Sequence, residues 1–337
     1  MMDKGGTMKN KNSNAPLGYF CSVLTLLLAM SVGAVFAQTT FPDKPVRIVV
    51  PFPPGGGTDL VVRALAAGMA TELNQSVIIE NKSGAGTVIG TDFVAKSPPD
   101  GYTLLVGTFA FAVNPSLLAK LPFDTNKAFD PIVLISRSPN VLVVRADSPY
   151  KSVQDIVRAA QKNPGKLTYA SQGNGTSAHL AAELFNALAN INVTHIPYKG
   201  ASPALTDIVG GQVDLMFATS AGATPLLESG RLRALAVTTP ERSPAFPSLP
   251  TMIEAGVPEY QATSWYGLYA PAGTPGAAIA RLNAAATKVA QADAFKSRVA
   301  SEGLVISTGT PAQLDEFMRG EQARWERVIK AAGIKAN

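Results

Sequence analysis

The chain contains very little cysteine and histidine. Cys21 is its single cysteine, and His179 and His195 are its two histidines. A disulfide framework needs paired cysteines, and protein zinc sites are usually built from several Cys and His side chains. We therefore expect no disulfide, no bound metal and no cofactor, and we assign no catalytic residue.

Long apolar runs are scarce as well. Only residues 17–36 approach the ~20 apolar residues that span a bilayer, and three lysines precede this segment. It ends in Val35-Phe36-Ala37, with small residues where a signal peptidase reads the chain. The pattern is typical of a signal peptide, so we predict that residues 1–37 are cleaved off near Ala37 and that the mature chain is periplasmic. The alternative is an uncleaved membrane anchor.

Clusters of like charge are missing too. Removal of residues 1–37 takes three lysines and one aspartate from the 29 basic and 24 acidic residues, which leaves a net charge of +3. The remaining basic residues are scattered and form no stripe, so the charge predicts no nucleic-acid partner.

Two common catalytic motifs are not found. No Lys-Ser/Thr pair follows the glycines at 55–57, which argues against a nucleoside triphosphate site. No Gly-x-Ser-x-Gly elbow occurs, which argues against a serine hydrolase. A turn at residues 84–90 is similar to a dinucleotide fingerprint, but its last spacing is one residue too long. We interpret it as a turn that brings backbone, including Ala85, close to the ligand.

What the chain does contain is one unit that occurs twice: a short apolar strand, a glycine-rich loop with hydroxyl side chains, and a helix. The first copy has its loop at residues 53–59 and its helix from about Leu60 to Leu73. The second has its loop at 172–177 and its helix from about Ala178 to Ala189. Free backbone N–H groups at a helix N-terminus attract anions. Two such loops predict one anion site built from two halves.

The rest of the chain alternates β-branched runs with helical patterns, which indicates an α/β fold with parallel sheets. We read 132–136 and 140–145 as separate strands, and place chain crossings near 140–145 and 262–266. This predicts a bilobal fold of the periplasmic-binding-protein (Venus flytrap) type, in which two α/β lobes are joined by a double-crossing hinge. Lobe 1 would comprise residues 41–140 and 265–337, and lobe 2 residues 141–264.

The residues leave two other classes of function open. A hydrolase or isomerase could use His179 with Asp214 or Asp59 for acid/base chemistry. A surface interaction module would bind no small molecule. His195, in an apolar strand, is expected in the core or at its rim, and Tyr198-Lys199-Gly200 either presents a phenol and an ammonium to an anion or forms a plain turn.

Several motifs, in their order and spacing along nearly the whole mature chain, strongly resemble one family. They are Pro45-Val46-Arg47-Ile48-Val49-Val50-Pro51-Phe52-Pro53-Pro54-Gly55-Gly56-Gly57-Thr58-Asp59, Pro99-Asp100-Gly101-Tyr102-Thr103-Leu104-Leu105, Tyr169-Ala170-Ser171-Gln172-Gly173-Asn174-Gly175-Thr176-Ser177-Ala178-His179, Pro197-Tyr198-Lys199-Gly200, Gly210-Gly211-Gln212-Val213-Asp214-Leu215-Met216-Phe217 and Ala270-Pro271-Ala272-Gly273-Thr274-Pro275. The family is that of the Bug-type extracytoplasmic solute receptors of tripartite tricarboxylate transporters.

The resemblance implies a periplasmic binding protein that holds a small carboxylated solute between its lobes through backbone amides, hydroxyls and waters. It also implies a membrane transporter or a sensor domain as partner, and we expect a monomer. Family members often carry Asp-Asn where this chain has Ala218-Thr219, which favours a ligand without an ammonium group. Phe109 and Phe111, expected in a loop, would line an apolar distal pocket or lie in the core.

Together, the two loops and the resemblance predict a set of ligand-binding residues. They are Pro53, Gly55, Gly56, Gly57, Thr58, Asp59, Ala85, Thr108, Ser171, Asn174, Gly175, Thr176, Ser177, His179, Tyr198 and Asp214.

Overall fold

The computed structural model describes residues 5–9, 41–300 and 303–334. The apolar segment of the predicted signal peptide and Ala37 lie outside these residues. In the described part of the chain, no helix is both long and apolar enough to cross a membrane. From Phe41 onward the chain folds as one unit.

The strands of this unit form a 10-stranded sheet in two parts. The first part consists of β2 (Val77–Asn81), β1 (Val46–Val50), β3 (Thr103–Thr108), β9 (Thr263–Pro271), the first half of β4 (Phe129–Arg145) and β10 (Val305–Ile306). The second part consists of the remainder of β4 with β7 (Leu215–Thr219), β5 (Thr168–Ser171), β6 (Thr194–Pro197) and β8 (Leu232–Val237).

Parallel pairing occurs in both parts, as predicted. β1 pairs in parallel with β2 and β3, and β5 pairs in parallel with β6 and β7. The apolar sequence of β1 is typical of a parallel strand covered on both faces. Because parallel strands end at the same edge of a sheet, the loops that follow them gather there, where ligands of α/β proteins usually bind.

Helices connect and cover these strands. They are α2 (Gly57–Leu73), the short 3-10 helix η1 (Ala85–Thr87), α3 (Val88–Ala95), α4 (Phe109–Leu117), α5 (Val153–Lys162), α6 (Ser177–Ala189), α7 (Ala201–Val209), α8 (Ser220–Glu228), α9 (Gly276–Gln291), α10 (Asp293–Val299) and α11 (Pro311–Ala332). Local sequence explains several boundaries. Thr310 and Gln313 form a capping box at the start of α11, and Gly333 adopts the left-handed conformation at its end.

One strand, β4, runs through both parts of the sheet. Its residues Phe129–Pro139 pair with β9, and Asn140–Val144 pair with β7. The prediction of two separate strands here was wrong, because Pro139 lies inside a continuous strand whose pairing with β9 contains irregularities of register. The chain therefore passes from one part of the sheet to the other between Pro139 and Asn140, close to the predicted crossing.

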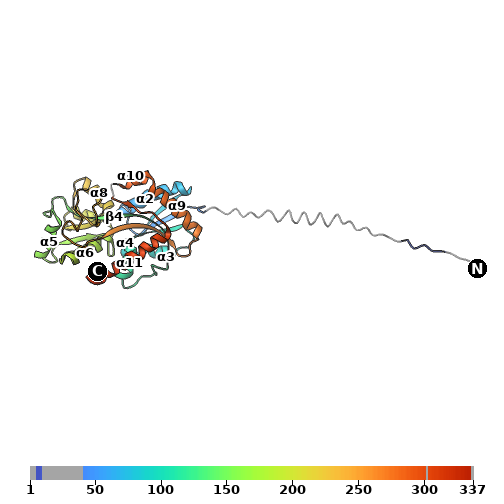
Figure 1. Ribbon diagram of the computed structural model, residues 1–337, viewed down its shortest axis with the longest axis horizontal. Helices are drawn as coiled ribbons and strands as arrows, with labels where there is room; N and C mark the ends of the chain where they lie inside the picture. Colours follow the sequence, from blue (N-terminus) through green and yellow to red (C-terminus); the bar gives the residue numbers. More distant parts are fainter. Residues whose placement is uncertain (1–4, 10–40, 301–302, 335–337) are drawn as a thin grey trace, which may run out of the picture. The chain divides into compact units, whose positions relative to one another are not determined.

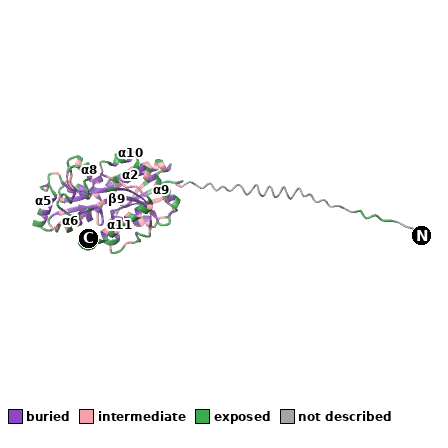
Figure 2. Ribbon diagram, viewed as in Figure 1, coloured by how far each residue is buried: buried purple, intermediate pink, exposed green. Residues whose placement is uncertain are grey.

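The chain passes between the two parts of the sheet a second time beside Pro139, which pairs with Thr263. There the Ala262 amide donates a hydrogen bond to the Thr238 carbonyl, just before β9 begins at Thr263. Figure 1 shows the result: α5, α6 and α8 lie toward one end of the folded unit, α2, α9 and α10 toward the other, with β4 between them. The strands are mostly buried, whereas exposed residues lie on the outer helices and loops (Figure 2).

The apolar core includes a buried cluster on each part of the sheet and one that spans both. The spanning cluster contains Leu105 of β3, Leu142 of β4, Tyr169 of β5 and Trp325 of α11. Phe109 and Phe111 belong to this cluster, within α4 and not in a loop, so the expectation of a loop there was wrong. Phe109 packs edge-on against Trp325 and Phe111 against Phe129, which leaves these rings in the core.

Candidate functional site

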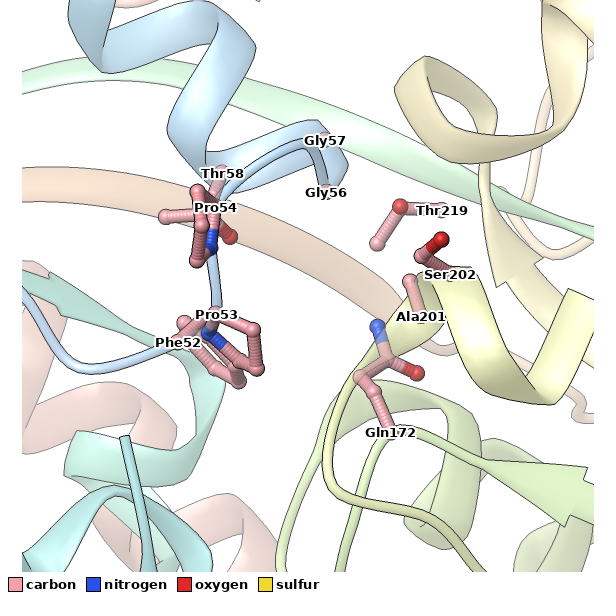
Figure 3. A pocket seen from close by; sticks show the side chains of 10 residues that line it. All are labelled: Phe52, Pro53, Pro54, Gly56, Gly57, Thr58, Gln172, Ala201, Ser202 and Thr219. Carbon is pink, nitrogen blue, oxygen red and sulfur yellow. The ribbon is translucent and has the colours of Figure 1, made fainter. Parts of the chain in front are cut away.

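Three adjoining pockets lie between the loops that follow β1 and β2 on one side and those that follow β5, β6 and β7 on the other. The narrow pocket, of ≈ 20 Å³, is lined by Phe52, Pro53, Pro54, Gly56, Gly57, Thr58, Gln172, Ala201, Ser202 and Thr219 (Figure 3). The large pocket, of ≈ 370 Å³, is lined by Pro51, Phe52, Pro53, Ser83, Gly84, Ala85, Gly86, Thr87, Gln172, Gly173, Thr176, Tyr198 and Lys199. The outer pocket, of ≈ 170 Å³, is lined by Gly55, Gly56, Ala201, Ser202, Leu205, Thr206, Val209, Gly222, Leu226 and Arg231.

The pockets share lining residues, so they follow one another along a single crevice. Phe52, Pro53 and Gln172 border both the narrow and the large pocket, and Gly56, Ala201 and Ser202 border both the narrow and the outer pocket. The structure thus brings the two glycine-rich loops to the same crevice. The narrow pocket has room for about one water-sized group, which is the scale of a carboxylate oxygen.

Helix N-termini converge on the narrow pocket. Gly56 and Gly57 begin α2, Ala201 begins α7, and Thr219 is the N-cap of α8; in Figure 3 these residues face one another across the pocket. The first amides of a helix have no acceptor within it, and neither Gly56 nor Gly200 has a side chain to cap them. The dipoles of all three helices favour negative charge at this point.

The two sides of the crevice approach each other closely at two glycines, Gly57 and Gly86. A Cβ at Gly57 would lie 2.8 Å from the Cβ of Ala221 and 3.0 Å from Thr219 Oγ1. A Cβ at Gly86 would lie 2.7 Å from the carbonyl oxygen of Asn174. Because real Cβ atoms do not come this close to such neighbours, these approaches require glycine. Glycine in these loops therefore serves close packing as well as the exposure of amides.

Asp59, predicted to contact the ligand, is instead used inside the first loop. Its carboxylate accepts hydrogen bonds from the Gly55 amide at 3.0 Å, Arg63 Nε at 2.8 Å and Asn81 Nδ2 at 2.9 Å. Burial raises the Asp59 pKa, but the hydrogen bonds from Arg63, Gly55 and Asn81 outweigh it, so the pKa lies below its ordinary value. Asp59 therefore stabilises the conformation of the loop. Its carboxylate is bound by these three donors and does not line the pocket.

In the second loop, several of the predicted donors also form hydrogen bonds within the loop and not toward the pocket. The Gly175 amide donates to His179 Nδ1 at 3.2 Å, and Thr176 Oγ1 donates to the Gly173 carbonyl at 2.7 Å. Ser171 Oγ lies 3.2 Å from the Gly173 carbonyl and 2.7 Å from His195 Nε2. Ser171, Gly175 and His179 thus shape the loop, while Thr176 also lines the large pocket.

His179 and His195 form a stack behind this loop. Their rings lie 4.3 Å apart, and His195 also stacks on Tyr169 at 4.7 Å. Burial, with His195 nearby, lowers the pKa of His179 to about 3, and burial lowers the pKa of His195 to about 4. Both rings are therefore neutral near pH 7, so Nδ1 of His179 can accept the Gly175 hydrogen bond.

Asp214 was placed wrongly in the predicted site. It precedes β7 and lies at the opposite end of that strand from Thr219. Its carboxylate accepts hydrogen bonds from the Thr168 amide at 2.8 Å and from Thr168 Oγ1 at 2.9 Å. His179, in contrast, contacts Gly175 and His195, so the His179–Asp214 pair of the hydrolase or isomerase alternative is not assembled.

The other predicted residues divide between the pocket wall and its support. Eight of them line at least one of the three pockets: Pro53, Gly55, Gly56, Gly57, Thr58, Ala85, Thr176 and Tyr198. Tyr198 also donates its hydroxyl to Asp207 at 2.6 Å, and burial together with this bond raises its pKa to about 12. Ser177 Oγ accepts from Asn140 Nδ2 at 3.1 Å, Thr108 is the buried N-cap of α4, and the Asn174 carbonyl faces Gly86.

Sequence reasoning missed part of the wall. Gln172, Lys199, Ala201, Ser202 and Thr219 line the crevice but were not in the predicted set. A signal for Lys199 and Ala201 was present, because Tyr198-Lys199-Gly200 follows a strand and precedes a helix. For Thr219 the signal came only from the resemblance, in which family members often carry Asp-Asn at Ala218-Thr219; α8 itself lacks a glycine-rich start and was not predicted.

The electrostatics of the crevice suit an anion. Of the described residues that line the three pockets, none is acidic, while Lys199 lines the large pocket and Arg231 the outer one. Within the described ranges, no three His, Cys, Asp or Glu side chains are grouped as metal ligands would be. The arrangement can bind a carboxylate through neutral N–H and hydroxyl donors.

Comparison with known proteins agrees with this geometry. Residues 61–334 match the model of the tripartite tricarboxylate transporter family receptor. The solved structure of the periplasmic binding protein BugD has a TM-score of 0.84 and 34% sequence identity, over 88% of this chain and 99% of that one.

Two further solved structures are similar and carry ligands. An R. palustris protein solved with adipate has a TM-score of 0.84 and 37% identity, over 88% of this chain and 99% of that one. MatC from Rhodopseudomonas palustris, solved with bound malate, has a TM-score of 0.82 and 35% identity, over 86% of this chain and all of that one. The chain thus belongs to the tripartite tricarboxylate transporter family receptors, as a Bug-type solute-binding receptor with the bilobal α/β fold of periplasmic binding proteins.

Proposed function

We propose that this receptor captures a small organic mono- or dicarboxylate in the crevice, releases it unchanged, and delivers it to a membrane transporter or a sensor domain. The observation that carries the proposal is the convergence of the α2, α7 and α8 N-termini on a pocket whose described lining has no acidic residue. The adipate and malate bound to two similar proteins support the same class of ligand.

The contacts that we assign to the ligand are the predicted residues that line the pockets and the Lys199 ammonium. Charge-assisted hydrogen bonds to a carboxylate contribute about 1.5 to 3 kcal/mol each. Four or five of them would support micromolar binding after the costs of association are met. The proposed ligand-contact residues are Pro53, Gly55, Gly56, Gly57, Thr58, Ala85, Thr176, Tyr198 and Lys199.

We also propose that the chain is divided into two lobes and that it acts in the periplasm. Residues 41–140 with 265–337 form one lobe and 141–264 the other, which the neighbouring chain passages at Pro139/Asn140 and Ala262/Thr263 support. The protein acts in the periplasm as a monomer after cleavage near Ala37. Mass spectrometry of the mature N-terminus and size-exclusion chromatography would check these two points.

A calorimetric screen of the mature protein tests the function. The probes are dicarboxylates, aromatic acids, amino acids and the corresponding amides. We expect micromolar binding of at least one carboxylate and no measurable binding of its amide, because the helix N-termini favour negative charge. Mass spectrometry after prolonged incubation should recover the ligand unchanged. Turnover of the ligand, or equal binding of acid and amide, would contradict the proposal.

A further inference from the structure

The short helix η1 carries backbone strain. Its residues Ala85, Gly86 and Thr87 have φ angles of 47°, 59° and 81°, all in the left-handed region. A side chain other than glycine is uncommon in this region, and a β-branched threonine is an outlier. Such strain persists only where the surrounding structure maintains it, and it is concentrated at ligand clamps and switches. Because all three residues line the large pocket, the strain lies in the wall of the candidate site.

Asn114 of α4 holds η1 in this conformation. Its Nδ2 donates hydrogen bonds to the Gly86 carbonyl at 2.9 Å and to Thr87 Oγ1 at 3.4 Å. Asn114 is only 3% exposed and lines none of the three pockets. Any effect of Asn114 on binding is therefore transmitted through the residues that it contacts.

The oxygen of the same amide lies against the second loop. A Cβ at Gly175 would lie 2.5 Å from Asn114 Oδ1, so the loop backbone passes close to this oxygen. Asn114 Oδ1 is buried and has no hydrogen-bond partner among the described residues. A buried acceptor without a donor is unfavourable, so this contact adds to the strain of η1 and does not relieve it. Gly86 also faces the carbonyl of Asn174 in the second loop.

These contacts join segments of the two proposed lobes. Asn114 and η1 belong to residues 41–140, and the second loop belongs to residues 141–264. Movement of the lobes apart would remove the second loop from η1 and let the strained backbone relax. We infer that, within the proposed carboxylate-binding function on which this inference rests, Asn114 is a positioning residue: it holds the η1 wall of the large pocket against the second loop and thereby stabilises the ligand-bound crevice.

Asn114→Leu tests the inference on the mature protein, because leucine keeps the approximate size of the side chain but has no donor. The probe is the tightest-binding acid of the calorimetric screen, which includes succinate, malate, adipate and benzoate. We expect its Kd to rise about tenfold or more, since η1 loses the hydrogen bonds that maintain its conformation. Thermal melts verify that the variant is folded, and Asn114→Ala replaces it if leucine prevents folding.

A double-mutant cycle with Gly86→Ala separates this role from a general support of the fold. The added methyl group would lie 2.7 Å from the Asn174 carbonyl oxygen and push η1 away from the second loop. Gly86→Ala should therefore also weaken binding about tenfold, and the double variant should bind within about threefold of the weaker single variant, because both changes remove the same contact. Independent effects would multiply to a loss of about 100-fold.

The control is Gly333→Ala, which should leave the Kd of the probe unchanged. Gly333 has a φ of 63°, close to the 59° of Gly86, but an added Cβ meets nothing within 4 Å. Wild-type affinity in folded Asn114→Leu or in Gly86→Ala, or a multiplied loss in the double variant, overturns the inference and leaves the proposed function intact. Failure of every mono- and dicarboxylate of the screen to bind the wild-type protein overturns the proposed function itself.

Discussion

At the scale of single residues, His179 shows how a buried titratable group can hold a loop of the crevice in place although it lines none of the three pockets. Its ring lies against His195, and its Nδ1 receives the Gly175 amide at the bend of the second loop. Since burial keeps the pKa of both rings far below 6.5, the imidazole remains an acceptor throughout the neutral range. Its function is to position the loop.

This environment predicts a dependence of stability on pH. Between pH 6.5 and about 4, these histidines bind protons in the unfolded state but remain neutral in the folded state. The free energy of unfolding should therefore be highest above about pH 6.5 and fall as the pH decreases through this window. In His179→Asn, where Asn Oδ1 can accept the Gly175 hydrogen bond, we expect a smaller loss, measured by urea unfolding at pH 7 and pH 4.5.

Two comparisons separate the effect of the histidine from that of other groups. Burial raises the pKa of Glu183, which therefore also contributes to the pH dependence, but it contributes equally in the wild type and in His179→Asn, so its effect cancels when their pH profiles are subtracted. His179→Phe removes the acceptor altogether, so it should lose about 1–3 kcal/mol of stability at pH 7 and bind the carboxylate more weakly. An unchanged pH profile in His179→Asn would show that this ring contributes nothing to acid sensitivity.

At the scale of elements, the contact between the start of α2 and the start of α8 decides how closely the crevice can close. Gly57 meets Thr219 and Ala221 there without a side chain. Ser220, the first residue of α8, is also joined through its hydroxyl to Ser138 of β4 at 2.8 Å. The position of α8 is therefore set by β4 as well as by its own strand, β7.

Gly57→Ala should weaken carboxylate binding by tenfold or more. The added methyl group would have to displace Ala221 or Thr219, which keeps the two helix N-termini from reaching the same carboxylate. Gly276→Ala is a matched control, since Gly276 also begins a helix and an added Cβ meets nothing within 4 Å. Calorimetry compares the two variants with the wild type; equal affinities in all three proteins would rule out this role of Gly57.

At the scale of the whole folded unit, the spanning cluster makes the two parts of the sheet depend on each other. Trp325 of α11 is fully buried in this cluster, together with Leu105 of β3 and Tyr169 of β5. Residues from both parts of the sheet therefore lose their apolar environment together when the protein unfolds. Cooperative unfolding follows from such shared burial.

We expect a single calorimetric unfolding transition for the mature protein. A carboxylate ligand at one hundred times its Kd should add about 2.7 kcal/mol to the free energy of unfolding. Trp325→Ala should reduce this free energy by about 3–5 kcal/mol, because a large cavity opens in the shared core. Two well-separated transitions in the wild-type protein would mean that the parts of the sheet unfold independently.

Much of the architecture could be predicted from local patterns. The alternation of strands and helices, the two chain passages and the start of α2 and α6 at glycine-rich loops all depend on short-range sequence, because hydrophobic period and turn residues act over a few positions. The anion-binding character of residues 55–58 was predictable for the same reason, since a helix N-terminus exposes its amides wherever it occurs.

Which residues face the ligand was decided by tertiary structure. Asp59 and Asp214 both looked like site residues, yet Asp59 is satisfied by Arg63 and Asn81, and Asp214 by Thr168. Gln172 and Thr219 were not in the predicted set of ligand-binding residues, yet both line the narrow pocket. The sequence alone determined most of the strands and helices, the net charge and the anion-binding character of the glycine-rich loops. The continuity of β4 and the partners of each polar group depend on contacts between segments far apart in the chain, and those contacts exist only after the sheet has assembled.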